Sequence, residues 1–171
     1  MLLAEALAAR KDALTEIAAL RERLAASAVR YEDQAATAED PAELIARLTE
    51  HLDTVQELTV RINRTNNEAR LGFDGAELTV MEAIALRERL ILGAKTRRAP
   101  VEVVDEALGA GRHATKRHDY FGSAKRTKDD VVQLAAIDVR AERQAADELS
   151  ERVRRLVLAL QARNWQTELV E

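Results

Sequence analysis

The sequence predicts a mainly α-helical protein, an antiparallel bundle of about four long helices arranged as helical hairpins within one domain, residues 1–171. Ala, Leu, Glu and Arg make up 94 of the 171 residues, whereas the chain has only six Gly and two Pro. Apolar side chains recur at alternating three- and four-residue spacing along several segments, as in amphipathic helices. Aromatic residues account for 3% of the chain, so we expect an aliphatic core.

The first helix is predicted between about residues 2 and 28. Its apolar stripe consists of Leu3, Leu7, Leu14, Ile17, Leu24 and Ala28, with Ala13 and Leu20 beside it. A second helix begins after Asp40, which can accept hydrogen bonds from unpaired amides, while Pro41 occupies a position that needs no amide. Its stripe contains Leu44, Leu48, His51, Val55, Leu58 and Ile62, and we expect it to end in the segment 63–67.

Gly72 and Gly75 predict a turn, and Thr79 with Glu82 forms a capping-box pattern that starts a third helix. The expected stripe of this helix contains Met81, Ile84, Ile91 and Ala94. Pro100 either kinks it or begins a short new helix. A long basic loop is expected at about 109–130, and short β elements are predicted near 29–31 and 131–137.

A last helix is predicted to begin after Asp138, which is a plausible N-cap. It ends near Asn164 and Trp165, and its core side chains are Val139, Leu149, Val153, Leu156 and Leu160. The apolar stripes of the first and last helices continue to the helix ends. Stripes of this length in a chain of this size favour a homo-oligomeric interface.

Composition excludes several functional classes. The chain contains no cysteine, which rules out disulfides, thiolate metal sites and thiol catalysis. The net charge of −4 argues against a general polycation, and no serine lies in a nucleophile context. The sequence begins without a signal-peptide pattern, and its longest strictly apolar run has five residues. We therefore expect a cytoplasmic protein without membrane contact, catalytic residues or cofactor.

The segment 109–128 is the exception to the acidic composition, with six basic residues and one acidic residue. Lys and Arg can neutralise phosphates, and Tyr120 or Phe121 can stack on bases. An alternative function is therefore phosphate or nucleic-acid binding through Arg112, Lys116, Arg117, Tyr120, Lys125, Arg126 and Lys128. The simpler interpretation is a solvated loop whose charges offset an acidic surface, because no nucleic-acid motif is present.

Two further places are weak candidates for ligands. His113 and His118 lie five residues apart, so a helix would place them on different faces, although a loop could bring them to one metal. Four polar side chains at the end of the second helix could line a small polar pocket with Trp165 from the last helix: Asn63, Arg64, Thr65 and Asn66. Trp165 is otherwise expected to pack as the anchor of its helix end.

Several segments resemble a family of small uncharacterised bacterial helical proteins that are often labelled septicolysin-like. They are the opening LAEAL, EDPAEL at the second helix start, INRTN at 62–66, Asp138-Val139 and the closing NWQTEL at 164–169. The resemblance implies a helical bundle without an established activity. Our leading hypothesis is thus a non-catalytic, oligomeric scaffold or interaction protein. The alternatives are phosphate or nucleic-acid binding, and a small-ligand or metal site.

Overall fold

The computed structural model describes residues 1–29, 39–120 and 135–171, with backbone alone for residues 110–120. These ranges form four helices and one two-stranded antiparallel sheet: α1 (Leu3–Ser27), α2 (Pro41–Glu68), β1 (Arg70–Phe73), β2 (Ala76–Thr79), α3 (Val80–Tyr120) and α4 (Val139–Asn164). The predicted mainly α-helical fold is confirmed. Residues Met1–Ala83 with Leu158–Glu171 form one compact unit, and Ile84–Val157 form another. The single-domain assignment stays a prediction.

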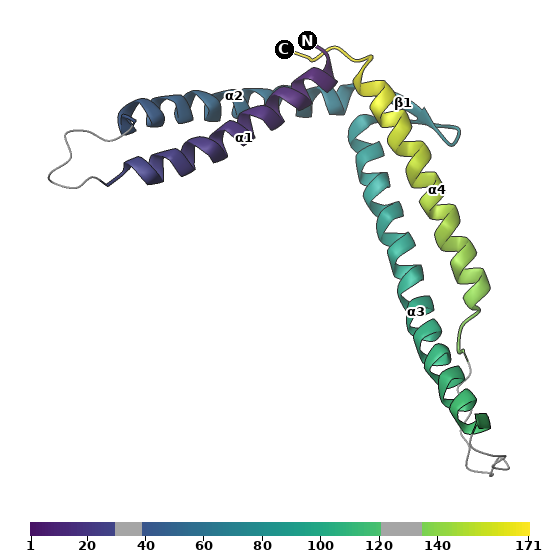
Figure 1. Cartoon of the computed structure of the whole chain (residues 1–171). Coiled ribbons are helices and arrows are strands. Elements are labelled where there is room, and N and C mark those ends of the chain that lie inside the picture. The colour runs from purple at the N-terminus through teal and green to yellow at the C-terminus, as the bar shows by residue number, and fades with distance from the viewer. Residues whose placement is uncertain (30–38, 121–134) are drawn as a thin grey trace. The chain divides into compact units, whose positions relative to one another are not determined.

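The first unit is built on the antiparallel pair α1 and α2, which lie side by side (Figure 1). The predicted cap is confirmed, because Asp40 accepts a hydrogen bond from the Ala42 amide at 2.9 Å and Pro41 follows it. At the opposite end of the pair, Leu3 and Ala6 of α1 share a core cluster with Leu58, Ile62 and Leu169. This cluster fixes the register of the hairpin.

The inward face of α1 differs from the predicted stripe. Its buried residues are Leu3, Ala6, Ala13, Leu20 and Ser27, whereas Leu7 is 36% exposed and Leu14 is 45% exposed. Small side chains at positions 6, 13 and 27 let the two helices approach closely. The larger leucines one position later are therefore left outside the core.

The β1–β2 hairpin was predicted only as a turn. Asp74 and Gly75 both have positive φ, 48° and 80°, and form the two-residue connection that matches the twist of paired strands. Leu71 pairs with Leu78, and the buried Phe73 pairs with Ala76. The amide of Val80 donates to the Ala69 carbonyl at 2.9 Å, which closes the open end of the hairpin.

The second unit consists of the antiparallel parts of α3 and α4. Its buried apolar residues are Leu90, Ala94, Val101, Ala146 and Leu156. Three cross-helix ion pairs accompany this core: Arg97 with Glu142 at 2.6 Å, Arg98 with Asp147 at 3.2 Å, and Arg143 with Asp105. The predicted capping role of Asp138 is confirmed, since it accepts from the Ala141 amide at 3.0 Å.

Helix α3 corrects three expectations. No new helix begins at Pro100, and no loop begins at Gly109, since the helical backbone continues to Tyr120. A kink at Pro100 stays a prediction. Ion pairs to α4 flank Pro100 on both sides, and buried Val101 follows it, so tertiary contacts offset the missing amide hydrogen bond. Met81, predicted for the core, is 39% exposed.

The remaining expectations concern short β elements. Residues 30–38 and 121–134 lie outside the described residues, and so do most of the β elements predicted near 29–31 and 131–137, together with part of the loop predicted at 109–130. Val29 and residues 135–137 are described, and they do not form strands.

Candidate functional site

The most distinctive surface of the first unit is an apolar flank of the α1–α2 hairpin, made of Leu7, Leu14, Ile45 and Leu52. These four side chains are 36%, 45%, 52% and 48% exposed, respectively. Each of them follows an inward-facing or half-buried residue by one position, namely Ala6, Ala13, Leu44 and His51. One residue turns a helix by about 100°, and equal rotations on two antiparallel helices point to the same side of the pair. The four residues therefore share one side.

The other side chains on this side are polar or charged. Arg10, Lys11 and Arg21 are the charged side chains that α1 contributes here, and α2 adds the uncharged Thr49 and Gln56, with Asp53 beside Gln56 at the edge of the flank. The Thr49 hydroxyl donates to the Ile45 carbonyl at 3.0 Å, so its hydrogen bond is already made within α2.

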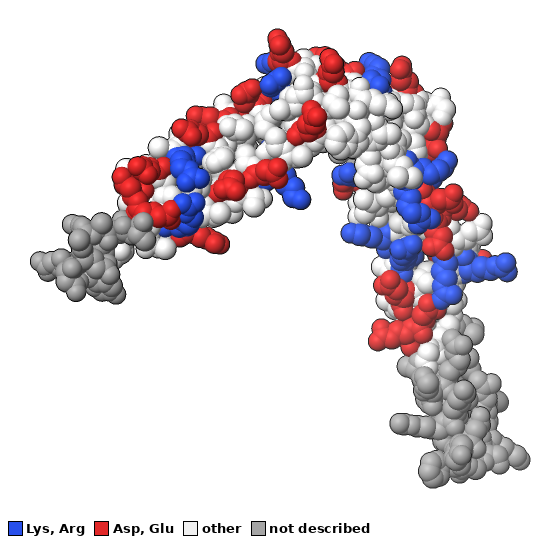
Figure 2. Space-filling view, turned by 45° about the horizontal axis from the view of Figure 1, so that its top comes forward, with Lys and Arg blue, Asp and Glu red and all other residues white. Residues whose placement is uncertain are grey.

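The opposite side of the same hairpin is charged. Arg23 of α1 donates from Nε to Glu39 at 2.9 Å and also forms an ion pair with it. These hydrogen bonds hold the pKa of the Glu39 carboxyl below its ordinary value near 4.5, and Arg47 of α2 acts in the same direction. In the space-filling view of Figure 2, charged side chains are interspersed with uncharged surface along this hairpin.

Helix α2 includes the whole Asn-rich segment and ends at Glu68, one residue beyond the range 63–67 in which its end was predicted. Thr65 is 1% exposed and Asn66 is 7% exposed, whereas Asn63 and Arg64 are exposed. Thr65 accepts from the Val170 amide at 3.0 Å and donates to the Arg61 carbonyl at 2.8 Å. Arg61 Nε donates to the Val170 carbonyl at 3.1 Å. The segment therefore binds the backbone of residues 170–171.

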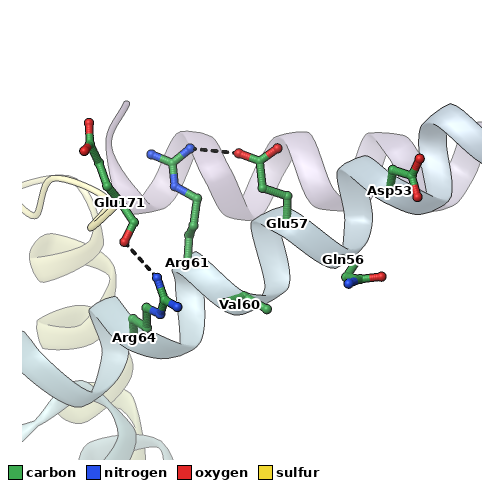
Figure 3. A pocket seen from close by; sticks show the side chains of 7 residues that line it. All are labelled: Asp53, Gln56, Glu57, Val60, Arg61, Arg64 and Glu171. Carbon is green, nitrogen blue, oxygen red and sulfur yellow. Dashed lines mark hydrogen bonds and ion pairs between the residues drawn. The ribbon is translucent and has the colours of Figure 1, made fainter.

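A shallow groove of about 610 Å³ begins at this contact and follows α2 (Figure 3). It is lined by Asp53, Gln56, Glu57, Val60, Arg61, Arg64 and Glu171. Both guanidinium groups are already engaged: Arg61 pairs with Glu57 at 3.2 Å, and Arg64 donates to the Glu171 backbone oxygen at 3.0 Å. The two arginines of the groove thus bind the backbone of residues 170–171. Binding of a small ligand in this groove stays a prediction.

The same closing segment also contacts the beginning of the chain. The Leu3 amide donates to the Thr167 carbonyl, and the Leu169 amide donates to the Met1 carbonyl, both at 2.9 Å. Leu2 and Glu168 form an antiparallel bridge between these contacts. The sequence analysis did not predict this contact between residues 1–3 and 167–169, because backbone hydrogen bonds between residues this far apart leave no local sequence pattern.

Trp165 does not anchor the end of α4 as predicted, since it is 63% exposed. It does not line the groove with Arg64. Just before it, Arg163 Nε and Asn164 Oδ1 are buried and have no hydrogen-bond partner within the part of the chain that the structure describes. Both atoms belong to half-buried residues at the last turn of α4.

The other predicted site residues lie where side chains are not described. Arg112, His113, Lys116, Arg117, His118 and Tyr120 belong to the backbone of α3, and Lys125, Arg126 and Lys128 lie outside the described residues. Among the described side chains, no group of three or more His, Asp or Glu residues is arranged to hold a metal ion. No stretch of the described helices combines the length and hydropathy that a membrane-spanning segment requires.

Comparison with known proteins gives two matches. Residues 10–169 match the sequence model of a family described as Family of unknown function (DUF6847). Among solved structures, the chain is similar to a functionally unknown conserved protein from Corynebacterium diphtheriae, with 29% sequence identity and a TM-score of 0.75. The similarity covers 99% of each chain. No protein of curated function matches.

Proposed function

We propose that this chain, which belongs to the Family of unknown function (DUF6847), is a non-catalytic helical scaffold that assembles with copies of itself in the cytoplasm. The observation that supports this proposal is the apolar flank of the α1–α2 hairpin. Leu7, Leu14, Ile45 and Leu52 are exposed on one side of two helices, where contiguous apolar surface is characteristic of interaction sites.

The described chemistry favours assembly over catalysis. The carboxyl groups that hold shifted pKa values, Glu39 and Glu82, are engaged by Arg23 and by Thr79 in ion pairing and helix capping. Neither carboxyl faces the α2 groove, whose arginines bind the chain's own residues. A scaffold needs capped, stable helices and an exposed apolar surface that a partner can cover. The first unit has both, in the capped helix α2 and the apolar flank.

Two finer hypotheses remain proposals. Phosphate or nucleic-acid binding through the basic residues of 109–128 draws its support from their charge alone. The label septicolysin-like draws its support from the sequence resemblance alone. Neither of these two hypotheses explains why the side chains of the apolar flank are exposed.

The mass of the full-length protein in solution tests the proposal. Multi-angle light scattering at micromolar concentration should give a multiple of the 19.0 kDa chain mass. A strict monomer of 19.0 kDa at these concentrations would exclude the homo-oligomeric scaffold.

A further inference from the structure

We infer that the apolar flank is covered by the same flank of a second copy, so that two α1–α2 hairpins form a four-helix bundle around a two-fold axis. This inference rests on the proposed function and specifies its interface. In the bundle, α1 of each copy packs on α2 of the other. Such an interface is self-complementary, as two-fold symmetry requires.

The spacing of the flank supports self-association. Leu7 and Leu14 are seven residues apart on α1, and Ile45 and Leu52 are seven residues apart on α2. Apolar residues that repeat every seven positions form a straight seam along a helix that packs on another such seam. Both helices of the hairpin therefore present rows with the same axial step.

The register of the hairpin brings Leu14 and Leu52 to the same height, while Leu7 and Ile45 lie about two helical turns from that level in opposite directions. Leu3 shares a core cluster with Ile62 at one end of the antiparallel pair. Leu14 lies eleven residues beyond Leu3, and Leu52 lies ten residues before Ile62, so both side chains stand at nearly the same level. A two-fold axis parallel to the helices then places Leu14 of each copy on Leu52 of the other.

The side of the hairpin that carries the flank is large enough for a dimer interface. The 25 residues of α1 extend over about 37 Å, and two adjacent helices are about 20 Å wide. This whole side, of which the four flank residues occupy a part, thus measures on the order of 700 Å² per copy, close to the roughly 800 Å² per partner of a standard protein–protein interface.

The chemistry of the flank is compatible with a second copy. Its charged residues are Arg10, Lys11 and Arg21 on α1, with Asp53 beside Gln56 at its edge on α2. By the same register, Asp53 of one copy stands close to the level of Lys11 of the other, so these opposite charges can pair at the rim of the contact. The Thr49 hydroxyl is already bonded to the Ile45 carbonyl.

A charge-complementation experiment tests this pairing. Leu14→Lys and Leu52→Glu are made separately in the full-length chain, and masses are measured by light scattering for each variant and for their mixture. Each variant alone should have a dimer dissociation constant raised at least about a hundredfold, since symmetry places the new charge in the interface twice. The mixture should recover a dimer, because the introduced lysine of one copy then meets the introduced glutamate of the other, while the remaining leucines meet each other.

Two matched controls make the result specific. Leu92→Glu alters an exposed leucine, 66%, on α3 in the second unit, outside the α1–α2 hairpin, and should leave the dimer unchanged. Circular dichroism should show unchanged helicity for the Leu14 and Leu52 variants, since both side chains are exposed in the single copy.

The remaining outcomes separate this inference from the proposed function. If the wild-type protein is oligomeric and both flank variants remain so, the flank pairing is overturned while the oligomeric scaffold stands. If both variants dissociate but their mixture is not restored, the packing of α1 on α2 is overturned. A monomeric wild-type protein would overturn both.

Discussion

Thr65 binds the backbone of Val170 across 105 residues of sequence: its hydroxyl oxygen accepts from the Val170 amide at 3.0 Å while its hydroxyl hydrogen is donated to the Arg61 carbonyl at 2.8 Å. This side chain is 1% exposed, so both hydrogen bonds are sheltered from water. Arg61 completes the contact from the same helix by donating to the Val170 carbonyl. The last turns of α2 thereby hold the closing segment of the chain.

Replacing Thr65 with Val should therefore be costly. The substitution keeps the shape of the side chain but leaves the half-buried Val170 amide without its acceptor, a loss of roughly 1–3 kcal/mol. Urea denaturation should show this loss, and hydrogen exchange should be faster at the Val170 amide. Thr54→Val is the control, since that exposed hydroxyl bonds only to the Glu50 carbonyl. Equal stability of the two variants would contradict a tertiary role for Thr65.

The capping box at the start of α3 predicts a pH dependence. Hydrogen bonds from the Thr79 amide and hydroxyl lower the pKa of Glu82 below its ordinary value near 4.5. A lowered folded-state pKa contributes stability above pH 4.5, which is lost as the pH falls through the folded-state pKa. The stability difference between the wild-type protein and Glu82→Gln should therefore be present at pH 7 and shrink below pH 4.5.

Nuclear magnetic resonance can follow the Glu82 carboxyl directly. In the wild-type protein it should titrate below an ordinary glutamate, and Thr79→Ala should move the titration back toward the ordinary value. A midpoint that does not respond to Thr79→Ala would show that the capping hydrogen bonds do not lower it.

The β1–β2 connection predicts opposite outcomes for two glycines. Gly75 has a φ of 80°, so Gly75→Ala should cost roughly 1–2 kcal/mol, because a Cβ is strained in the left-handed region. Gly72 has no positive φ, and a Cβ there would meet no atom within 4 Å. Gly72→Ala should therefore stay within about 0.5 kcal/mol of the wild-type protein. Thermal unfolding of both variants provides the comparison, and equal losses would argue against the observed turn.

The second unit offers a similar contrast on α3. Leu90 is 2% exposed and Leu92 is 66% exposed. Leu90→Ala should destabilise the protein by about 2–5 kcal/mol through the cavity it leaves, whereas Leu92→Ala should change stability by about 0.5 kcal/mol or less. Chemical denaturation measures both. A larger loss from Leu92→Ala would mean that this side chain is covered in solution.

Local capping chemistry allowed the starts of α2, α3 and α4 to be predicted from the sequence. Asp40 with Pro41, Thr79 with Glu82, and Asp138 are short-range signals, and the structure uses each of them as expected. The β1–β2 hairpin also had a local signal in Asp74-Gly75, which was interpreted as a turn without its strands. Continuation of α3 past Pro100 depends on ion pairs to α4, which no local pattern contains.

The candidate site was less predictable. Hydrophobic spacing placed Leu7 and Leu14 in the core, because pattern reasoning favours the larger apolar side chain over an adjacent alanine. The structure buries Ala6 and Ala13 instead, and this choice creates the apolar flank. It depends on how closely α2 approaches, which is a property of the packed pair and not of either helix.

The most direct measurement of the scaffold proposal is the solution mass of the wild-type chain beside that of Leu14→Lys. Light scattering at micromolar concentration should give twice the 19.0 kDa chain mass for the wild-type protein and 19.0 kDa for the variant. A wild-type mass of 19.0 kDa, with the apolar flank left facing water, would contradict the proposal.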